Sequence, residues 1–178
     1  MNDNKLFTVR TSMEKKDYRN FLYIAIFLKN KIKIPVMILF IAFLSTLLAY
    51  SENEFYIKDF FIYFIILIIV FILTIIFKIE VKIKQRIKTD KLGTFNSQGI
   101  LDFYESFLTA KSTVIEGESK IKYDQFYKVF ETKNYFINYF NIDQAALIRK
   151  KDMENKTIES LRNLYKNNIK NKYKRVKI

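Results

Sequence analysis

The side chains that could do chemistry in this chain are carboxylates, hydroxyls, amides and a large excess of basic groups. Its 178 residues include no His and no Cys. Imidazole and thiolate catalysis, disulfides and the commonest zinc ligands are therefore excluded. Asp102, Asp124 and Glu131 have no evident partner for paired-carboxylate catalysis, and no Gly-rich phosphate loop is present. We therefore expect a non-enzymatic protein with no catalytic, cofactor-binding or metal-binding residues.

The basic residues indicate contact with an anionic surface. Lys and Arg together number 31 against 18 Asp and Glu, a net charge of +13. A basic side chain beside the inner leaflet gains about 1 kcal/mol against anionic lipid. The candidate contacts to anionic lipid headgroups are Lys78, Lys82, Lys84, Arg86, Lys170, Lys172, Lys174, Arg175 and Lys177. Simpler explanations stay open: a Lys-, Ile- and Asn-rich composition is typical of an AT-rich genome, and residues 170–178 could equally be a solvated tail.

Two other groups of residues could suggest ligands. Aromatic residues recur at strand spacing at Tyr123, Phe126, Tyr127, Phe130, Tyr135, Phe136, Tyr139 and Phe140. Such residues could stack on nucleotide bases, but at this spacing they are far more typical of a small β-rich core, so no nucleic-acid partner is expected. Glu52, Glu54 and Asp59 could bind a cation, but a solvated turn explains them better.

Two apolar runs predict a membrane hairpin. Phe60 to Phe77 contains no charge, Pro or Gly, and as a helix it would cover about 27 Å of a hydrocarbon core about 30 Å thick. Ile34 to Tyr50 is slightly shorter, with Pro35 in its first turn, where a missing N–H costs nothing. We expect membrane spans at 34–50 and 60–77, joined by a short loop.

The distribution of basic residues predicts the orientation of this hairpin. Both flanks, 1–33 and 78–91, are rich in Lys and Arg, whereas the intervening loop has only Lys58 beside three carboxylates. By the positive-inside rule, both termini lie in the cytoplasm and the acidic loop lies outside. The sequence thus predicts a multi-pass protein of the cell membrane.

The segments that flank the spans have weaker patterns. Leu6 to Thr11 alternates as a strand would, Thr11 to Glu14 fits a helix capping box, and Asp17 to Lys29 predicts an amphipathic helix. That helix could lie on the membrane surface or against the soluble module, or it could be an ordinary core helix. In the basic connector 78–91, apolar alternation favours a strand, whereas the lack of Gly and Pro favours a continuous helix, and both stay open.

The remaining residues predict a small α+β cytoplasmic domain, 92–172, followed by a basic tail, 173–178. Short strand-like runs alternate with turn residues about every ten positions, as in an antiparallel meander. An amphipathic helix with Thr157 as N-cap would close the domain. This layout, an antiparallel β-barrel capped by a C-terminal helix, is pleckstrin-homology-like (PH-like). The expected strands are 93–96, 100–104, 107–115, 120–123, 128–132, 135–140 and 145–150, with turns at 97–99 and 117–119 and a helical turn at 124–127.

A family resemblance is found in the same domain. The stretches from Ile121 to Phe136 and from Asp143 to Lys150 resemble the YcxB-like family of small bacterial membrane proteins. The family often has Trp where this chain has Tyr123. It often has Pro-Lys-Arg where this chain has Arg149, Lys150 and Lys151. The resemblance implies two spans, a C-terminal PH-like domain and a place in the bacterial cytoplasmic membrane. It implies no activity, because none is established for the family.

Three functions are consistent with these expectations. The first is a membrane protein whose cytoplasmic PH-like domain docks a protein or peptide, for example at an exposed strand edge. The second is a homo-oligomeric small transporter or pore component, although spans without charged residues make a solute path hard to build. The third is an immunity-type protein that protects the membrane. The expected partners are the lipid bilayer, its anionic headgroups, and a protein partner or further copies of the chain.

Overall fold

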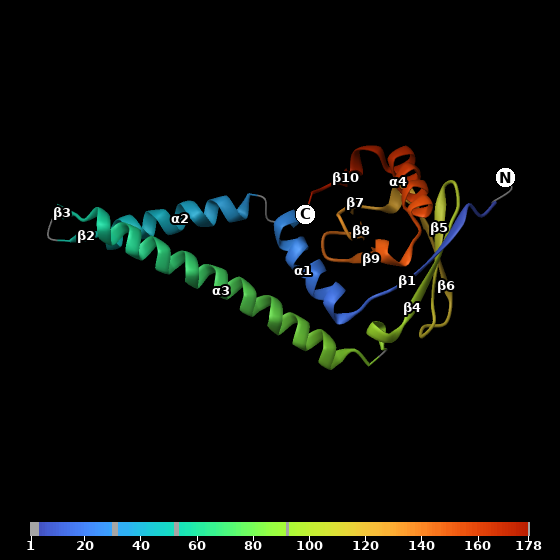
Figure 1. The fold of residues 1–178 in the computed structure, drawn as a ribbon, viewed down its shortest axis with the longest axis horizontal. Helices are drawn as coiled ribbons and strands as arrows, with labels where there is room; N and C mark the ends of the chain where they lie inside the picture. Colours follow the sequence, from blue (N-terminus) through green and yellow to red (C-terminus); the bar gives the residue numbers. More distant parts are fainter. Residues whose placement is uncertain (1–3, 30–31, 52–53, 92, 178) are drawn as a thin grey trace. The chain divides into compact units, whose positions relative to one another are not determined.

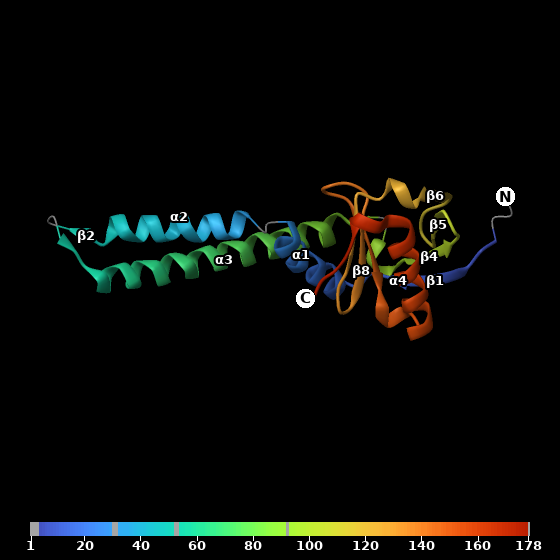
Figure 2. The ribbon, with the colours of Figure 1, turned by 90° about the horizontal axis from the view of Figure 1, so that it is seen from above.

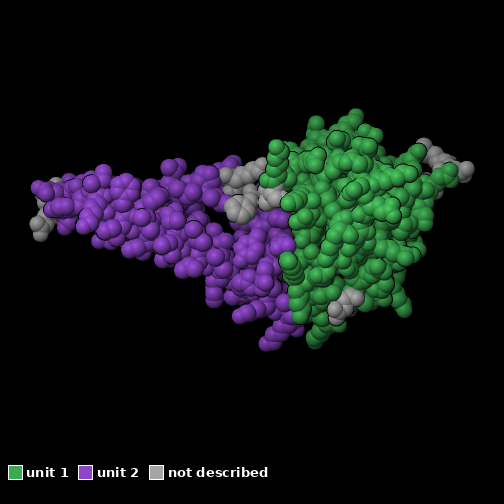
Figure 3. All heavy atoms as spheres, in the orientation of Figure 1, with its two compact units in different colours: residues 1–17, 90–178 green, residues 18–89 purple. Residues whose placement is uncertain are grey.

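The chain forms two compact units that are not consecutive in the sequence. The computed structural model describes residues 4–29, 32–51, 54–91 and 93–177. Residues 1–17 and 90–178 make one unit, here called the strand-rich unit, and residues 18–89 make the other, the helical unit (Figure 3). The structure therefore divides the chain differently from the prediction, since the N-terminal segment 1–33 is shared between the two units and does not stand apart.

The first sheet of the strand-rich unit includes a strand from the N-terminal segment of the chain. Strand β1 pairs antiparallel with β4, so that Phe7 lies opposite Phe103 and Ser12 opposite Gln98 (Figure 1). The period-2 pattern at residues 6–11 correctly predicted a strand but could not name this partner. The sheet has the order β1-β4-β5-β6 and consists of β1 Phe7–Ser12, β4 Gln98–Phe103, β5 Phe107–Ser112 and β6 Glu118–Lys122.

The second sheet contains the C-terminus. Its order is β10-β7-β8-β9, and β10 runs parallel to β7, with Tyr173 opposite Val129 and Arg175 opposite Glu131. The predicted basic tail 173–178 is therefore in part an edge strand. The members are β7 Lys128–Glu131, β8 Tyr135–Tyr139, β9 Ala145–Arg149 and β10 Tyr173–Arg175.

One amphipathic helix packs on both sheets. Helix α4, Asn155–Ile169, begins after Glu154 and not at the predicted N-cap Thr157. Its apolar side chains pack into the core as the amphipathic pattern predicted: Ile158, Leu161, Leu164, Tyr165 and Ile169. The fully buried Tyr165 makes edge-on ring contacts with Phe103, Tyr123 and Phe136. Aromatic residues bury large apolar areas, so this ring cluster is the main contribution to the core of the unit.

The two sheets do not close into the predicted barrel. Strands β6 and β7 are separated by a short 3-10 turn, η2 Tyr123–Gln125, and the edge of β7 that a barrel would join to β6 is occupied by β10. The result is an α+β unit of two antiparallel sheets with one added parallel strand. Further 3-10 turns are η1 Thr94–Asn96, η3 Lys150–Asp152 and η4 Lys170–Lys172. The expected strand at 93–96 and turn at 97–99 were wrong, because η1 and the start of β4 lie there.

The helical unit contains one helix with the length and composition of a membrane span. Helix α3, Ile57–Thr89, has 33 residues, which corresponds to about 50 Å. Helix α2, Lys33–Leu48, is apolar but has only 16 residues. The two helices pack along each other (Figure 2). Ile41 and Ser45 of α2 are buried, as is Ala49, which directly follows the helix. Two short strands, β2 Tyr50–Ser51 and β3 Glu54–Phe55, pair in the connection between them.

The basic connector is a helix, not a strand. Residues 78–89 continue α3 without a break. Ile79 and Ile83 are buried against Leu22 of α1, Lys15–Lys29. Apolar residues at every second position also fall at every fourth position, so the alternation was equally compatible with one helical face. The predicted amphipathic helix near the N-terminus therefore packs on α3, where Arg19 and Glu80 form an ion pair of 2.9 Å.

Candidate functional site

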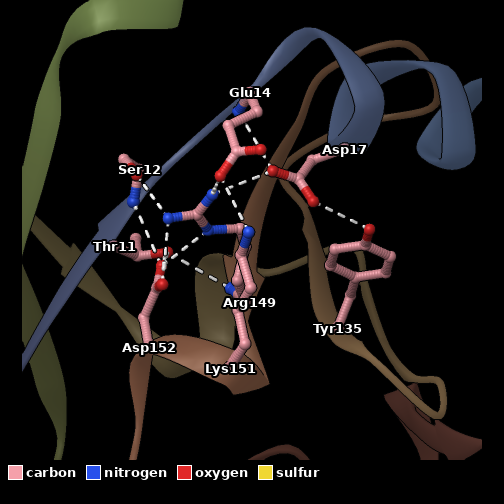
Figure 4. Close-up of polar contacts among 8 residues, drawn as sticks. All are labelled: Thr11, Ser12, Glu14, Asp17, Tyr135, Arg149, Lys151 and Asp152. Atoms are coloured by element: carbon pink, nitrogen blue, oxygen red, sulfur yellow. Dashed lines mark hydrogen bonds and ion pairs between the residues drawn. The ribbon is translucent and has the colours of Figure 1, made fainter.

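A buried arginine organises one end of the strand-rich unit. Arg149, at the end of β9, has a side chain that is only 7% exposed and donates hydrogen bonds to three carboxylates (Figure 4). Its Nη1 lies 2.6 Å from Glu14 Oε1 and 3.0 Å from Asp17 Oδ2, and its Nε lies 2.7 Å from Asp152 Oδ2. A guanidinium with planar donors suits such multiple pairing. Arg149 therefore ties β9 to the segment that follows β1.

The start of α1 is capped within this cluster, but not as predicted. Thr11 belongs to β1 and donates its hydroxyl to Asp152 at 3.0 Å instead of capping a helix. Asp17 takes the expected role of Glu14, because its Oδ2 accepts the Glu14 backbone N–H at 3.0 Å. This is the return contact of a capping box, moved three residues along the chain. Lys151 completes the cluster with an exposed bond of 2.7 Å to Glu14.

The carboxylate of Asp17 is held in its charged form. Burial alone would raise its pKa, but hydrogen bonds from the Glu14 backbone, from Arg149 and from the Tyr135 hydroxyl lower that pKa below its usual value. The Tyr135 hydroxyl donates to Asp17 Oδ1 at 2.9 Å. A carboxylate with a lowered pKa is a weak base, and these three hydrogen bonds hold the start of α1 to Tyr135 of β8 and Arg149 of β9.

A second buried charge cluster surrounds Glu131 at the end of β7. This carboxylate is fully buried and accepts hydrogen bonds from Arg162 of α4 at 2.5 Å, from Lys150 at 2.6 Å and from the Tyr173 hydroxyl. Arg175 of β10 also lies 3.8 Å from it. Glu131 therefore holds α4, η3 and the C-terminal strand to β7.

The environment of Glu131 strongly favours ionisation. Burial would raise its pKa, but the donors from Arg162, Lys150 and Tyr173 together lower the pKa to about 2. A general acid or base near neutral pH needs a pKa close to the working pH. The geometry of Glu131 is that of a structural anchor.

The other two candidate carboxylates lie apart from both clusters. Asp102 of β4 accepts a hydrogen bond from Thr8 at 2.5 Å and pairs with Lys5 at 3.4 Å. Asp124 is exposed in η2, and its backbone carbonyl accepts Lys172 Nζ at 3.0 Å. Within the described part of the chain, no group of three or more acidic side chains is placed to hold a metal ion. Of the three loop carboxylates, Glu54 and Asp59 lie among these described residues, whereas Glu52 lies outside them.

The first group of predicted lipid contacts lies on one helix. Lys78, Lys82, Lys84 and Arg86 are all exposed on the last turns of α3, directly after its apolar part. At about 100° per residue, Lys78, Lys82 and Arg86 lie on one side of the helix, within about 80° of one another, and Lys84 lies on another side. Long basic side chains directly after an apolar helix are placed to reach lipid headgroups if that helix spans a membrane.

The C-terminal group is partly used within the fold. Lys172 donates to the backbone carbonyls of Asp124 and Phe126, both at 3.0 Å, and Arg175 lies next to Glu131. Lys170, Lys174 and Lys177 are exposed. The basic run is therefore not a uniformly solvated tail, because Lys172 and Arg175 take part in holding β10.

The aromatic residues that could have stacked on bases mainly form the core. Six of the eight are buried, and the exposed ones are Tyr127 and Phe140, at 43% and 36% exposure. Phe140 stacks on buried Phe126 at a centroid distance of 5.5 Å. The interpretation of this group as a core and not a stacking platform is thus confirmed for its buried members.

One edge of the first sheet is open. Strand β6 pairs with β5, and no other strand of the described residues pairs with its outer edge. Its side chains Glu118, Lys120 and Lys122 are exposed, and the Lys122 backbone N–H is bonded by Gln125 Oε1 at 2.9 Å. Lys on an edge strand hinders uncontrolled strand pairing, while a matched acidic segment could still pair there.

Sequence reasoning missed the two residues that hold the strand-rich unit together. Arg149 and Arg162 are only 6% and 8% exposed, and neither of them was assigned a buried role from the sequence. Their positions gave no signal of burial, because the residue after a buried strand residue such as Ile148 points to the opposite face, and Arg162 is offset from Leu161 by about 100° on the helix.

The chain matches no protein-family model, no curated protein sequence and no solved structure. The resemblance to the YcxB-like family therefore stays a prediction that no match tests.

Proposed function

We propose that this chain is an integral membrane protein that holds a PH-like docking module at the cytoplasmic face of the bilayer. The observation that carries the proposal is the inverted surface of the helical unit. Along α3, Ile65, Ile69 and Leu73 are each more than half exposed, and α2 exposes Leu39 and Phe43 in the same way. Exposed apolar surface on this scale is unfavourable in water and favourable in hydrocarbon.

A second argument concerns the number of crossings. Strand β1 precedes the helical unit and β4 follows it, yet the two strands pair over their whole length. Paired strands must lie on the same side of a membrane, so the helical unit would cross an even number of times. If α3 spans, α2 is the natural second crossing. Its length of about 24 Å would be accommodated by local thinning and by Lys33 reaching the headgroups.

The docking role rests on the open edge of β6. A peptide in extended conformation could add to this edge through its backbone, while Lys120 and Lys122, on one face of the strand, would favour acidic side chains at alternate positions. The two sheets and their packed C-terminal helix share the strand-then-helix order of a PH-like layout, but not its closed barrel.

The pore hypothesis gains less support from the described helices. Ser45, Thr46 and Thr74 donate their hydroxyls to backbone carbonyls four residues earlier, at 2.8, 3.0 and 2.8 Å. Hydroxyls bonded in this way offer little to a solute. The immunity hypothesis has no feature that favours it.

The crossing number can be tested with single cysteines, because the native chain has none. We expect Asn4→Cys and Asn171→Cys to be labelled by a membrane-impermeant maleimide only after sealed cells are opened, and Glu54→Cys to be labelled before. Labelling of the first two on opposite sides would contradict the proposal, as would release of the chain by alkaline carbonate.

Docking can be tested by photo-crosslinking in cells. A photoreactive residue at Ser119 should give a discrete adduct with another protein, and the charge reversal Lys120→Glu with Lys122→Glu should abolish it. The control probe replaces Lys156, on α4. Equal adducts from both probes would contradict a specific edge, and a ladder of self-adducts would support the oligomeric alternative.

A further inference from the structure

The helical unit contains an apolar cavity that its own side chains do not fill. The cavity has a volume of about 460 Å³ and lies among α1, α2 and α3, which are labelled in Figure 1. Its wall includes Tyr23 and Ile26 of α1, Ile34 and Ile38 of α2, and Ile72 and Ile75 of α3. The volume lies in the range of small-molecule sites, about 300 to 1,000 Å³.

The lining determines which kind of molecule can occupy the cavity. The side chains that face it present carbon atoms only, so a water molecule would find none of the two to four polar partners that it needs. The cavity is open on one side, because its lining residues Ile38, Ile72 and Ile76 are 40%, 49% and 40% exposed. An apolar chain that enters from this side would cover apolar surface at no cost in hydrogen bonds.

The position of the cavity along the helices indicates a phospholipid. Lys33 directly precedes the lining residue Ile34, and Lys78 follows the lining residue Ile76 by two positions, so both basic side chains flank the same end of the cavity. Both are exposed, and neither forms an ion pair with a described residue. An apolar slot with cations at one end matches an acyl tail that carries an anionic headgroup.

The cavity also differs from the rest of the apolar surface. Leu39 and Leu73 are adjacent in sequence to the lining residues Ile38 and Ile72, but they are 70% and 58% exposed and do not line the cavity. At Leu39 and Leu73, bulk lipid would lie against the outer surface of a single helix. In the cavity, α1 adds a third wall, so a tail there would contact three helices and not one layer of side chains.

We infer that this cavity binds one acyl chain of an anionic phospholipid, with the phosphate held near Lys33 and Lys78. The inference rests on the proposed membrane function and adds a defined lipid site to it. A lipid bound there would fill the space between α1 and the hairpin and so support the packing of all three helices.

The test uses the full chain in detergent micelles and the fact that it contains no Trp. Tyr23→Trp places a single fluorophore in the wall of the cavity. Phosphatidylglycerol with brominated tails, which quench Trp on contact, should quench this reporter in a saturable way. Brominated phosphatidylcholine should quench it less strongly at the same concentration, because its headgroup has no net charge.

A pair of matched variants separates the cavity from the outer face. In the reporter background, Ile38→Phe with Ile72→Phe should raise the half-quenching concentration about tenfold, as expected when roughly two methylenes can no longer be buried. The control, Leu39→Phe with Leu73→Phe, should leave it unchanged. Circular dichroism and size-exclusion chromatography check that both variants keep their helix content and monodispersity.

Each other outcome overturns the inference. Quenching that does not saturate would show that the reporter contacts only bulk lipid. Equal quenching curves for the two double Phe variants, in the cavity and on the outer face, would show the same. Equal binding of the two brominated lipids would refute the anionic preference. If the chain is a dimer, and only the variant Ile38→Phe with Ile72→Phe is monomeric, a second copy of the chain and not a lipid occupies the cavity. If native membranes retain the chain in alkaline carbonate while these results are negative, only the lipid site fails; release by carbonate refutes the proposed function as well.

Discussion

The two units of this protein place polar and apolar groups in opposite ways. The strand-rich unit buries rings such as Phe136 and Tyr165 and pairs its buried charges completely around Arg149 and Glu131. The helical unit exposes most of the apolar surface of α2 and α3 and buries the hydroxyl of Ser45. The first arrangement is the one expected in water, and the second is the one expected in hydrocarbon if the proposed membrane function is right. The comparison predicts that the same substitution will have different effects in the two units.

The largest expected effect comes from placing charge on the exposed face of α3. Ile66→Lys with Ile69→Lys changes two residues that are 50% and 51% exposed. In hydrocarbon the two charges should oppose insertion by about 6 kcal/mol, enough to remove the preference of the helix for lipid. We expect the variant to be extracted from membranes by alkaline carbonate.

The matched control places the same two charges in the strand-rich unit. Val114→Lys with Ile115→Lys changes residues of similar exposure, 43% and 52%, between β5 and β6. Exposed substitutions in water usually change stability by less than about 0.5 kcal/mol, so this variant should stay in the membrane fraction and fold normally. If both double variants behave alike, the helical surface does not face lipid.

The next largest effect is expected at Glu131. Glu131→Gln keeps the shape of the side chain but removes the buried countercharge of Arg162 and Lys150, and Arg162 then keeps only the exposed Glu159. Removing one partner of a buried ion pair typically costs about 3 to 5 kcal/mol. The midpoint temperature of thermal unfolding of the strand-rich unit should therefore be strongly lowered. It can be measured by near-UV circular dichroism of the full chain. Glu159→Gln, which removes only the exposed partner of Arg162, should cost less than about 1 kcal/mol.

Glu131 also predicts how stability depends on pH. Its pKa in the folded chain is lowered to about 2, from an ordinary value of 4.5. A lowered pKa contributes stability that is complete above the unfolded value and is lost as the pH falls towards the folded value. The midpoint temperature of thermal unfolding should therefore decrease as the pH is lowered from about 4.5 to about 2. In Glu131→Gln, the plot of this temperature against pH should be flatter over the same range. An unchanged slope in the variant would assign the acid sensitivity to other carboxylates.

The elements of the two units differ in how far the sequence could predict them. The apolar helix that contains Phe60 to Phe77 and the stripe of α4 were predictable because the signal is local: a run of apolar residues, or a repeat that matches the helical period. The pairing of β1 with β4 was not, because alternation identifies a strand but contains no information about a partner beyond an inserted unit. The parallel strand β10 was hidden for a related reason, since its exposed Lys and Arg made it look like a tail.

The candidate site was predictable in part. The basic group on α3 could be named from the residues that follow the span, although its conformation stayed open until the contact of Ile79 and Ile83 with Leu22 showed one helical face. The buried roles of Arg149 and Glu131 depend on partners that are distant in the sequence, from residue 14 to residue 173. No local pattern encodes such contacts.

A smaller effect is expected at Tyr135, which donates its hydroxyl to buried Asp17. Tyr135→Phe removes one of the donors that keep this carboxylate ionised, and an unsatisfied buried acceptor costs about 1 to 3 kcal/mol. The loss should be visible as a lower thermal midpoint and as a pKa of Asp17 that moves upward, measured by NMR. Tyr127→Phe, at an exposed position, should leave both quantities unchanged.

The smallest effect is expected at Ser45, although this residue is as buried as any polar residue of the strand-rich unit. Its hydroxyl donates only to the Ile41 carbonyl of its own helix, at 2.8 Å, and that carbonyl keeps a backbone donor without it. Ser45→Ala also introduces a better helix former, so unfolding in mixed detergent micelles should change by less than about 0.5 kcal/mol. Ser45→Leu, in contrast, should push α2 away from α3 and cost about 1 to 3 kcal/mol. A large loss in the Ala variant would mean that the hydroxyl serves a partner outside its helix, and the helical unit would then depend on buried polar contacts as the strand-rich unit does.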